Sequence, residues 1–234
     1  MQIKSVIITV ILSIFSSGGN AQKITWEKKE WELVNTKASM VSLGKFDQVL
    51  KVERDLTSFP FDEKNLDATT DGPSFVKLTN LNMENGSVEV KVLSRIQENN
   101  PFPAARGFIG LAYRIDKANK HFDAMYLRPS NGRADDQLRR NHSVQYFSYP
   151  DFGFNRLRKE ANGLYETYAN IGLDEWITMR IEFQHKKARL YLNQQEQPAF
   201  IVNEMLGNSK TGSIGLWVEI GTVGYFRDLK IHQD

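Results

Sequence analysis

The pattern that most constrains the fold is a succession of short apolar segments separated by turn-forming residues. Turn pairs such as Asn85-Gly86 and Asn162-Gly163 recur from about residue 46 onward. Between them apolar and polar residues alternate, as in Ser87–Ser94 (SVEVKVLS), and no long amphipathic helical pattern occurs. Alternation is typical of a strand with one buried face. The chain is therefore predicted to be all-β, a two-sheet antiparallel jelly-roll sandwich.

Twelve segments have the length and composition of strands. They are Gln48–Glu53, Ser74–Leu78, Ser87–Ser94, Phe108–Ile115, His121–Arg128, Ser143–Phe147, Tyr165–Tyr168, Trp176–Phe183, Ala188–Leu192, Ala199–Val202, Ser213–Glu219 and Thr222–Ile231. The segment Ile24–Asn35 (ITWEKKEWELVN) alternates polar and large apolar residues, which leaves a short helix and an edge strand both open. The polar residues 60–73 are expected to form an excursion on the surface.

The first 21 residues have the pattern of a secretory signal peptide. A positive charge at Lys4 precedes the apolar run Ser5–Phe15, and small residues precede an expected cleavage site after Ala21. The alternative is an uncleaved membrane anchor, but the apolar run is short for a membrane span. We expect export to the periplasm or the medium, a single domain at residues 22–234, and no stable membrane insertion after cleavage.

Cysteine content and charge exclude several classes of function. The chain contains no cysteine, which removes disulfides, thiol nucleophiles and thiolate metal sites. The formal net charge is +2, from 30 basic and 28 acidic side chains. Such a balance argues against nucleic acid as the principal partner. A domain of this size must then be stabilised by its apolar core alone.

The second half of the chain resembles a known fold family. The order FIGLAYRI, FDAMYLRP, EWITMRIEF, KARLYLN, GSIGLWVE and YFRDLKI is similar to concanavalin A-like lectin/glucanase jelly rolls. Within that fold it resembles the LamG-like domains of exported bacterial proteins, labelled family 16 glycoside hydrolases or 3-keto-disaccharide hydrolases. The resemblance covers about residues 40–231. It implies that a carbohydrate lies on the concave sheet and its rim loops.

One departure from this family bears on catalysis. Its retaining laminarinase-type members carry closely spaced acids, Glu-x-Asp-x-x-Glu or Glu-x-Asp-x-Glu, on one strand. That spacing puts the carboxylates on the same sheet face, where they can flank a glycosidic bond. No such motif occurs in this chain. Ordinary retaining glucanase chemistry is therefore not expected.

The connection from Tyr126 to Arg158 is the predicted ligand site. It holds six arginines among many amides and aromatic rings, a mixture that suits a ligand with hydroxyls or a carboxylate. The predicted ligand contacts are Tyr126, Arg128, Asn131, Arg133, Arg140, Gln145 and Tyr146. In the alternative interpretation, the arginines hold the loop by pairing with nearby carboxylates and the aromatic residues fill its interior.

Three residues are the candidates for catalysis: His142, with Asp123 or Glu219 as the acid. His142 could transfer a proton near neutral pH, or it could be a hydrogen-bonded loop histidine. Trp217 should share a sheet face with Glu219, where it is either a stacking platform for a sugar or part of the core. No pattern of metal ligands is present, so no cofactor is required and a divalent metal is left open.

The sequence therefore predicts an exported domain that binds a glycan or glycoside on its concave face. Hydrolysis or elimination of a glycoside, including a 3-keto-glycoside, is the catalytic version of this hypothesis. A non-catalytic lectin-like module or a protein-interaction module is the alternative. The residues alone do not decide whether the site is catalytic.

Overall fold

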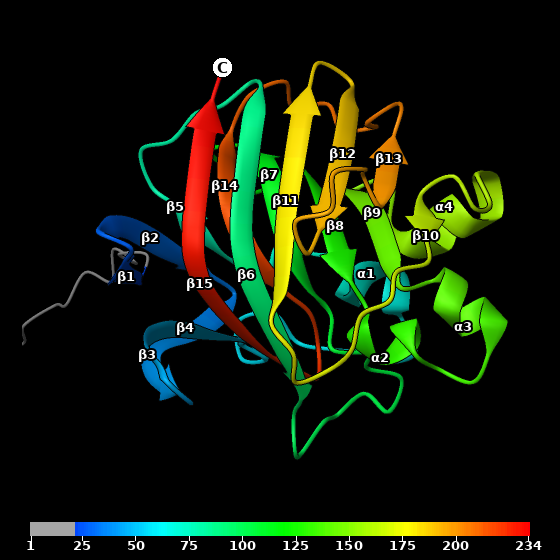
Figure 1. Ribbon diagram of the computed structural model, residues 1–234, viewed down its shortest axis with the longest axis horizontal. Coiled ribbons are helices and arrows are strands. Elements are labelled where there is room, and N and C mark those ends of the chain that lie inside the picture. Colours follow the sequence, from blue (N-terminus) through cyan, green and yellow to red (C-terminus); the bar gives the residue numbers. More distant parts are fainter. Residues whose placement is uncertain (1–21) are drawn as a thin grey trace, which may run out of the picture.

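The computed structural model describes residues 22–234, which form two antiparallel sheets packed against each other (Figure 1). The eight-stranded sheet has the order β1 (Lys23–Trp26), β2 (Lys29–Val34), β5 (Phe75–Leu78), β14 (Ser213–Val218), β7 (Ile109–Ile115), β8 (Phe122–Leu127), β9 (Val144–Tyr149) and β10 (Glu166–Thr167). The seven-stranded sheet has the order β13 (Phe200–Val202), β12 (Lys187–Leu192), β11 (Ile177–Gln184), β6 (Gly86–Ile96), β15 (Thr222–Gln233), β4 (Phe46–Arg54) and β3 (Thr36–Leu43). The predicted all-β sandwich is confirmed. The predicted signal peptide lies outside the described residues.

The segment left open between helix and edge strand is a β-hairpin. Strands β1 and β2 pair across a two-residue turn at Glu27 and Lys28. Both turn residues have a positive φ, 49° and 57°. A turn with two positive φ values follows the right-handed twist of the strands, and Asn-Gly is its usual sequence. The pair Glu-Lys is not typical of such a turn, so the sequence pattern did not distinguish a hairpin from a short helix.

The core lies between the two sheets and follows the alternation of the sequence. Val88, Val90 and Val92 of β6 point inward and are buried, while the residues between them are partly exposed. Across the interface, the rings of Tyr113 and Phe183 stack with centroids 4.9 Å apart. These contacts exclude water from a core that includes both sheets.

The same contact identifies the two faces of the eight-stranded sheet. Asp123 pairs in register with Tyr113, so its side chain also points between the sheets. Tyr126 has the opposite parity along β8 and points to the outer face, where its ring meets those of Trp217 and Phe147. Aromatic side chains thus cover part of the outer face as well as the core.

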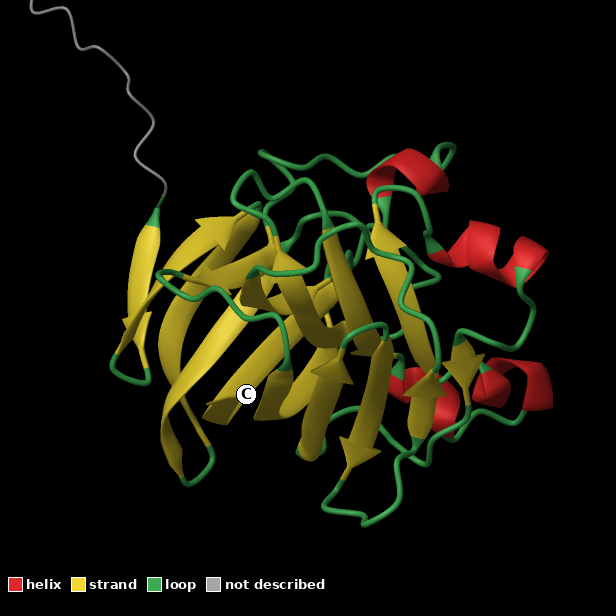
Figure 2. Ribbon diagram, turned by 90° about the horizontal axis from the view of Figure 1, so that it is seen from above, coloured by secondary structure: helices red, strands yellow, loops and turns green. Residues whose placement is uncertain are grey.

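Four short helices lie together beside strands β8 to β10 (Figures 1 and 2). They are α1 (Leu66–Thr69), α2 (Pro129–Gly132), α3 (Gln137–Asn141) and α4 (Phe154–Glu160). Three of them belong to the arginine-rich connection, so that stretch is ordered by helices and by β9 rather than forming one long loop. No helix in residues 22–234 is long and apolar enough to cross a membrane.

Candidate functional site

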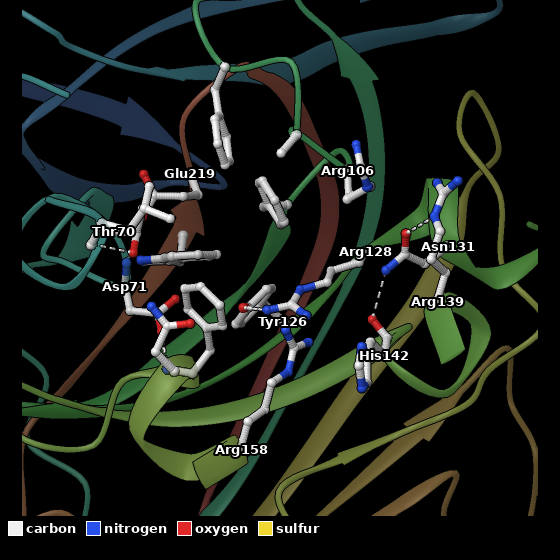
Figure 3. A pocket seen from close by; sticks show the side chains of 17 residues that line it. Thr70, Asp71, Arg106, Tyr126, Arg128, Asn131, Arg139, His142, Arg158 and Glu219 are labelled. Carbon is white, nitrogen blue, oxygen red and sulfur yellow. Dashed lines mark hydrogen bonds between the residues drawn. The ribbon is translucent and has the colours of Figure 1, made fainter. Parts of the chain in front are cut away.

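A pocket of about 340 Å³ opens between the helices and the outer face of the eight-stranded sheet (Figure 3). Its volume is in the range of small-ligand sites, roughly 300–1,000 Å³. It is lined by Leu66, Thr70, Asp71, Phe102, Ala104, Arg106, Phe108, Tyr126, Arg128, Asn131, Arg139, His142, Phe154, Asn155, Arg158, Trp217 and Glu219. Segments far apart in the sequence therefore meet here, and they include six residues of the predicted site.

Trp217 and Tyr126 form the buried floor of the pocket. Their ring centroids lie 4.9 Å apart, and Phe147 packs 5.3 Å from Trp217. The indole nitrogen of Trp217 donates a hydrogen bond to the Gly72 carbonyl over 2.9 Å. Because neighbouring rings cover it, Trp217 does not offer a free face for stacking on a sugar. The slightly exposed rings of Phe102 and Phe108 and the half-buried ring of Phe154 occupy the accessible wall instead.

Arg128 places a buried guanidinium at the centre of the pocket (Figure 3). Only 5% of the residue is exposed. Its Nη2 donates to the Tyr126 hydroxyl, and its Nε has no hydrogen-bond partner. The guanidinium carbon lies 5.4 Å from the centre of the Phe154 ring and 5.8 Å from that of Phe108. Such rings attract a cation, but they do not satisfy its N–H donors.

Glu166 holds Arg158 and His142 at one side of the pocket. Arg158 Nη2 lies 2.9 Å from Glu166 Oε2, and His142 Nε2 lies 3.2 Å from Glu166 Oε1. Burial and the nearby Arg158 lower the pKa of His142. Its ring is therefore mostly neutral at neutral pH, and its Nε2 lies against the carboxylate. This contact occupies the nitrogen that would otherwise be free for acid–base chemistry.

Asn131 uses its amide group to fix the loop around His142. Its Nδ2 donates to the His142 carbonyl over 3.1 Å, and its Oδ1 accepts from Arg139 Nε over 3.4 Å. Helix α2, which carries Asn131, packs tightly on the segment after β10. A Cβ on Gly132 would lie 2.3 Å from the Ile171 carbonyl oxygen, so only glycine fits there.

Two buried carboxyl groups lie at the other side of the pocket. Glu219 forms an ion pair with Arg54, and its Oε2 accepts from the Asp71 backbone N–H over 2.9 Å. Asp71 Oδ2 accepts from the Phe154 N–H over 2.7 Å. Burial raises the pKa of Asp71 to about 7, despite the opposing effects of that hydrogen bond and of Arg128. Burial also raises the pKa of Glu219, against the effect of Arg54. Asp71 can therefore hold or release a proton near neutral pH.

Two predicted ligand contacts lie outside the pocket and pair with the protein itself. Arg133 forms an ion pair with Glu175, with Nη1 2.9 Å from Oε2. Arg140 donates to the Tyr168 hydroxyl over 2.9 Å and stacks on that ring. Of the six arginines in the connection, Arg128, Arg139 and Arg158 line the pocket and the others do not. Some arginines of this stretch thus line the pocket, as the ligand-site interpretation predicts, and others hold the chain by pairing with the protein, as the alternative predicts.

Three other predicted site residues are buried away from the pocket. Asp123 and Tyr146 point between the sheets, where the Tyr146 hydroxyl donates to the Asp123 carboxylate. Burial raises the pKa of Asp123 to about 6. Gln145 of β9 pairs in register with Glu166 of β10, and its side chain donates to the Tyr165 carbonyl over 3.1 Å. Because none of the three reaches the pocket, we propose no ligand contact or catalytic role for them.

Sequence reasoning missed Asp71 and Arg54. Asp71 belongs to an Asp-Gly-Pro turn, a signal that normally marks the surface, within the segment expected to be a surface excursion. In the structure it has a φ of 53° and its side chain turns inward. Arg54 is the last residue of β4 and reaches Glu219 across 165 positions of sequence. Neither residue belongs to a motif, so only the folded arrangement identifies them.

The described residues offer no preformed metal centre. In residues 22–234, no three histidine, aspartate or glutamate side chains lie close enough together to hold a metal ion. Asp71 and Glu219 are adjacent, but Glu219 is paired with Arg54.

The comparisons with known proteins identify the fold. No protein-family model matches the chain, and no curated protein matches it in sequence. Among solved structures, it is similar to the carbohydrate-binding module CBM66 of Bacillus subtilis, with 14% identity over 86% of this chain and 97% of that chain, at a TM-score of 0.52. The fold is a concanavalin A-like sandwich.

Two further structures resemble this sandwich less closely. One is domain 4 of an extracellular arabinanase from Geobacillus stearothermophilus, in complex with arabinotriose: 13% identity, 84% of this chain, 75% of that chain, TM-score 0.43. The other is a Bacillus subtilis protein with a galectin-like fold: 10% identity, 87% of this chain, 89% of that chain, TM-score 0.44.

Proposed function

We propose that the protein binds a carbohydrate in the pocket between the helices and the outer sheet face. The observation that carries the proposal is the composition of the pocket wall. Guanidinium, amide and carboxyl groups alternate there with the rings of Phe102, Phe108 and Phe154. Sugars present hydroxyls on their edges and apolar C–H groups on their faces, and such a wall can meet both. CBM66, which shares the sandwich, is by name a carbohydrate-binding module.

A blocking substitution tests this proposal. Ala104 is exposed and lines the pocket, so Ala104→Trp should fill the opening without disturbing the core. Ala118→Trp is the matched control, because Ala118 lies in the turn between β7 and β8, whereas the pocket lies beyond the other end of β8. Wild type and both variants would be screened on a glycan array and by titration calorimetry. The proposal predicts binding that only Ala104→Trp abolishes; binding unaffected by both substitutions would place the sugar elsewhere.

Glycoside cleavage is a second candidate function, favoured by Asp71. A carboxyl group with a pKa of about 7 is suited to donate a proton to a leaving oxygen near neutral pH. This would agree with the resemblance to 3-keto-disaccharide hydrolases, although the paired acids of laminarinases are absent from the sequence. Mass spectrometry of products from polysaccharides, glycosides and 3-keto-glycosides tests it. Turnover should disappear in Asp71→Asn and persist in Asp135→Asn, which changes an exposed carboxylate.

We also propose that the protein is exported. The support is the signal-peptide pattern in the first 21 residues. Amino-terminal sequencing of the protein recovered from the periplasm or medium should begin at Gln22. Recovery of the intact chain from the cytoplasm would contradict this proposal.

A further inference from the structure

The charges that line the pocket do not balance. Four guanidinium groups line it, those of Arg106, Arg128, Arg139 and Arg158, against the two carboxyl groups of Asp71 and Glu219. Two of these six charges are neutralised by residues outside the lining: Glu219 pairs with Arg54 and Arg158 with Glu166. Three guanidinium groups then remain against Asp71 alone.

None of these three arginines forms an ion pair within the described chain. Arg106 donates to the Ala105 carbonyl, Arg139 to the Asn131 side chain, and Arg128 to the Tyr126 hydroxyl. In residues 22–234, no carboxylate oxygen lies within 4.0 Å of any of their guanidinium nitrogens. Burial and the neighbouring Arg139 and Arg128 lower the pKa of Arg106, so these cations are close enough to repel one another. Asp71, with its pKa of about 7, offsets this charge only in part.

Arg54 shows what a structural arginine looks like in the same region. It is as buried as Arg128, and it donates to Glu219 and to the carbonyls of Phe59, Pro60 and Thr69. Arg128 has one acceptor for its five N–H groups. A buried cation without a counter-ion destabilises a folded protein, because it has lost its hydration and gained little in return. A ligand anion would supply the counter-ion and the hydrogen-bond acceptors that Arg128 lacks.

We infer that the ligand of this pocket is an acidic sugar, whose carboxylate or sulfate group binds Arg128. This inference rests on the proposed carbohydrate function and adds the class of sugar. Arg128 and Arg158 lie over the same ring, 5.4 and 5.3 Å from the centre of Phe154. Arg158 is already paired with Glu166, so the unpaired guanidinium of Arg128 is the one left to bind an anion here, and its planar fork can hold two oxygens.

The test compares acidic sugars with neutral sugars of the same backbone. The probes are trigalacturonate and its carboxyl-reduced form, and a sulfated galactan trisaccharide and its desulfated form, each titrated by calorimetry into wild-type protein. We expect an acidic form to bind roughly 10- to 100-fold more tightly than its neutral counterpart, the range for a hydrogen bond to a charged group. The two pairs distinguish carboxylate from sulfate.

Two variants locate the anion. Arg128→Met should remove the preference for the acidic form without lowering the unfolding midpoint of the free protein. Arg133→Met, an exposed arginine paired with Glu175, should change neither. A strongly lowered midpoint in Arg128→Met with the acidic preference retained in the remaining folded protein would make Arg128 structural and overturn the inference.

The outcomes separate the two proposals. Equal binding of acidic and neutral forms, blocked by Ala104→Trp, would overturn the acidic sugar and leave carbohydrate binding standing. Binding of neither form, here and across the glycan array, would overturn both.

Discussion

Arg54 and Arg128 are buried to the same extent, but Arg54 has a carboxylate partner and Arg128 has none. Their removal should therefore have different effects on stability. Arg54→Met would leave the carboxylate of Glu219 buried without its partner. We expect this substitution to lower the free energy of unfolding by about 3–5 kcal/mol. Arg128→Met removes no ion pair and should not lower it. Urea denaturation of the two variants checks the contrast, and equal losses would contradict it.

Asp71 gives the stability of the free protein a defined pH dependence. Its pKa is about 7 in the folded chain, against about 3.9 for an aspartate in an unfolded chain. The protonated form is thus favoured by folding, and its contribution to stability is complete below pH 4 and is lost as the pH rises through 7.

The expected outcome for Asp71→Asn follows from this sign. The variant should be more stable than wild type at pH 8, by roughly 2–4 kcal/mol, and similar to it at pH 3.5. An asparagine oxygen can still accept from the Phe154 N–H, so the local structure is kept. Chemical denaturation at both pH values measures the difference, with Asp135→Asn as the exposed control. A stabilisation that is the same at both values would refute the assignment.

For single residues, the sequence predicted which kinds of side chain form the site better than it predicted which of them reach the pocket. Alternation along β14 correctly placed Trp217 and Glu219 on one face, because strand parity is a local property. It did not show that Asp123 faces the core, since both faces of β8 are covered and every residue in it is buried. Asp71 reaches the pocket, and Arg54 reaches Glu219 from outside it, through long-range contacts that no local pattern encodes.

Among the elements, the β1–β2 hairpin offers a direct test of turn chemistry. Glu27 and Lys28 adopt positive φ values, which are strained for residues with a Cβ. Replacing them by Asn and Gly should raise the free energy of unfolding by about 1 kcal/mol. The same replacement at Glu63 and Lys64, exposed residues without a positive φ, should not stabilise the protein. Thermal unfolding of the two double variants distinguishes these results; equal midpoints would contradict the expectation.

All twelve predicted segments contain a strand, because alternation and turn residues are strong local signals. Strand β3 was not identified, since Thr36–Leu43 carries few large apolar side chains. The segment of β1 and β2 was left open between a helix and an edge strand, because the turn at Glu27-Lys28 lacks the usual residues. Helices α3 and α4 were also missed. They are five and seven residues long, which is too short for a helical period to stand out.

For the whole molecule, one apolar core joins the two sheets. Residues 22–234 should therefore unfold in one cooperative transition, with the same midpoint by far-ultraviolet circular dichroism and by tryptophan fluorescence. Phe183→Ala removes the ring stacked on Tyr113 and should lower the free energy of unfolding by about 3–5 kcal/mol. The midpoints measured by the two signals should fall together. Two separate transitions would show that the sandwich is not a single folding unit.

The direction of the last strand has a practical consequence for presenting the protein on a surface. Strand β15 begins three residues after Glu219, at the pocket, and runs for twelve residues to Gln233. An extended strand rises about 3.4 Å per residue, so its far end lies roughly 35 Å from the pocket. Figure 1 shows this end opposite the side where α2 lies. A tether attached beyond β15 would leave the pocket facing away from the support, open to polymers too large to diffuse into a matrix.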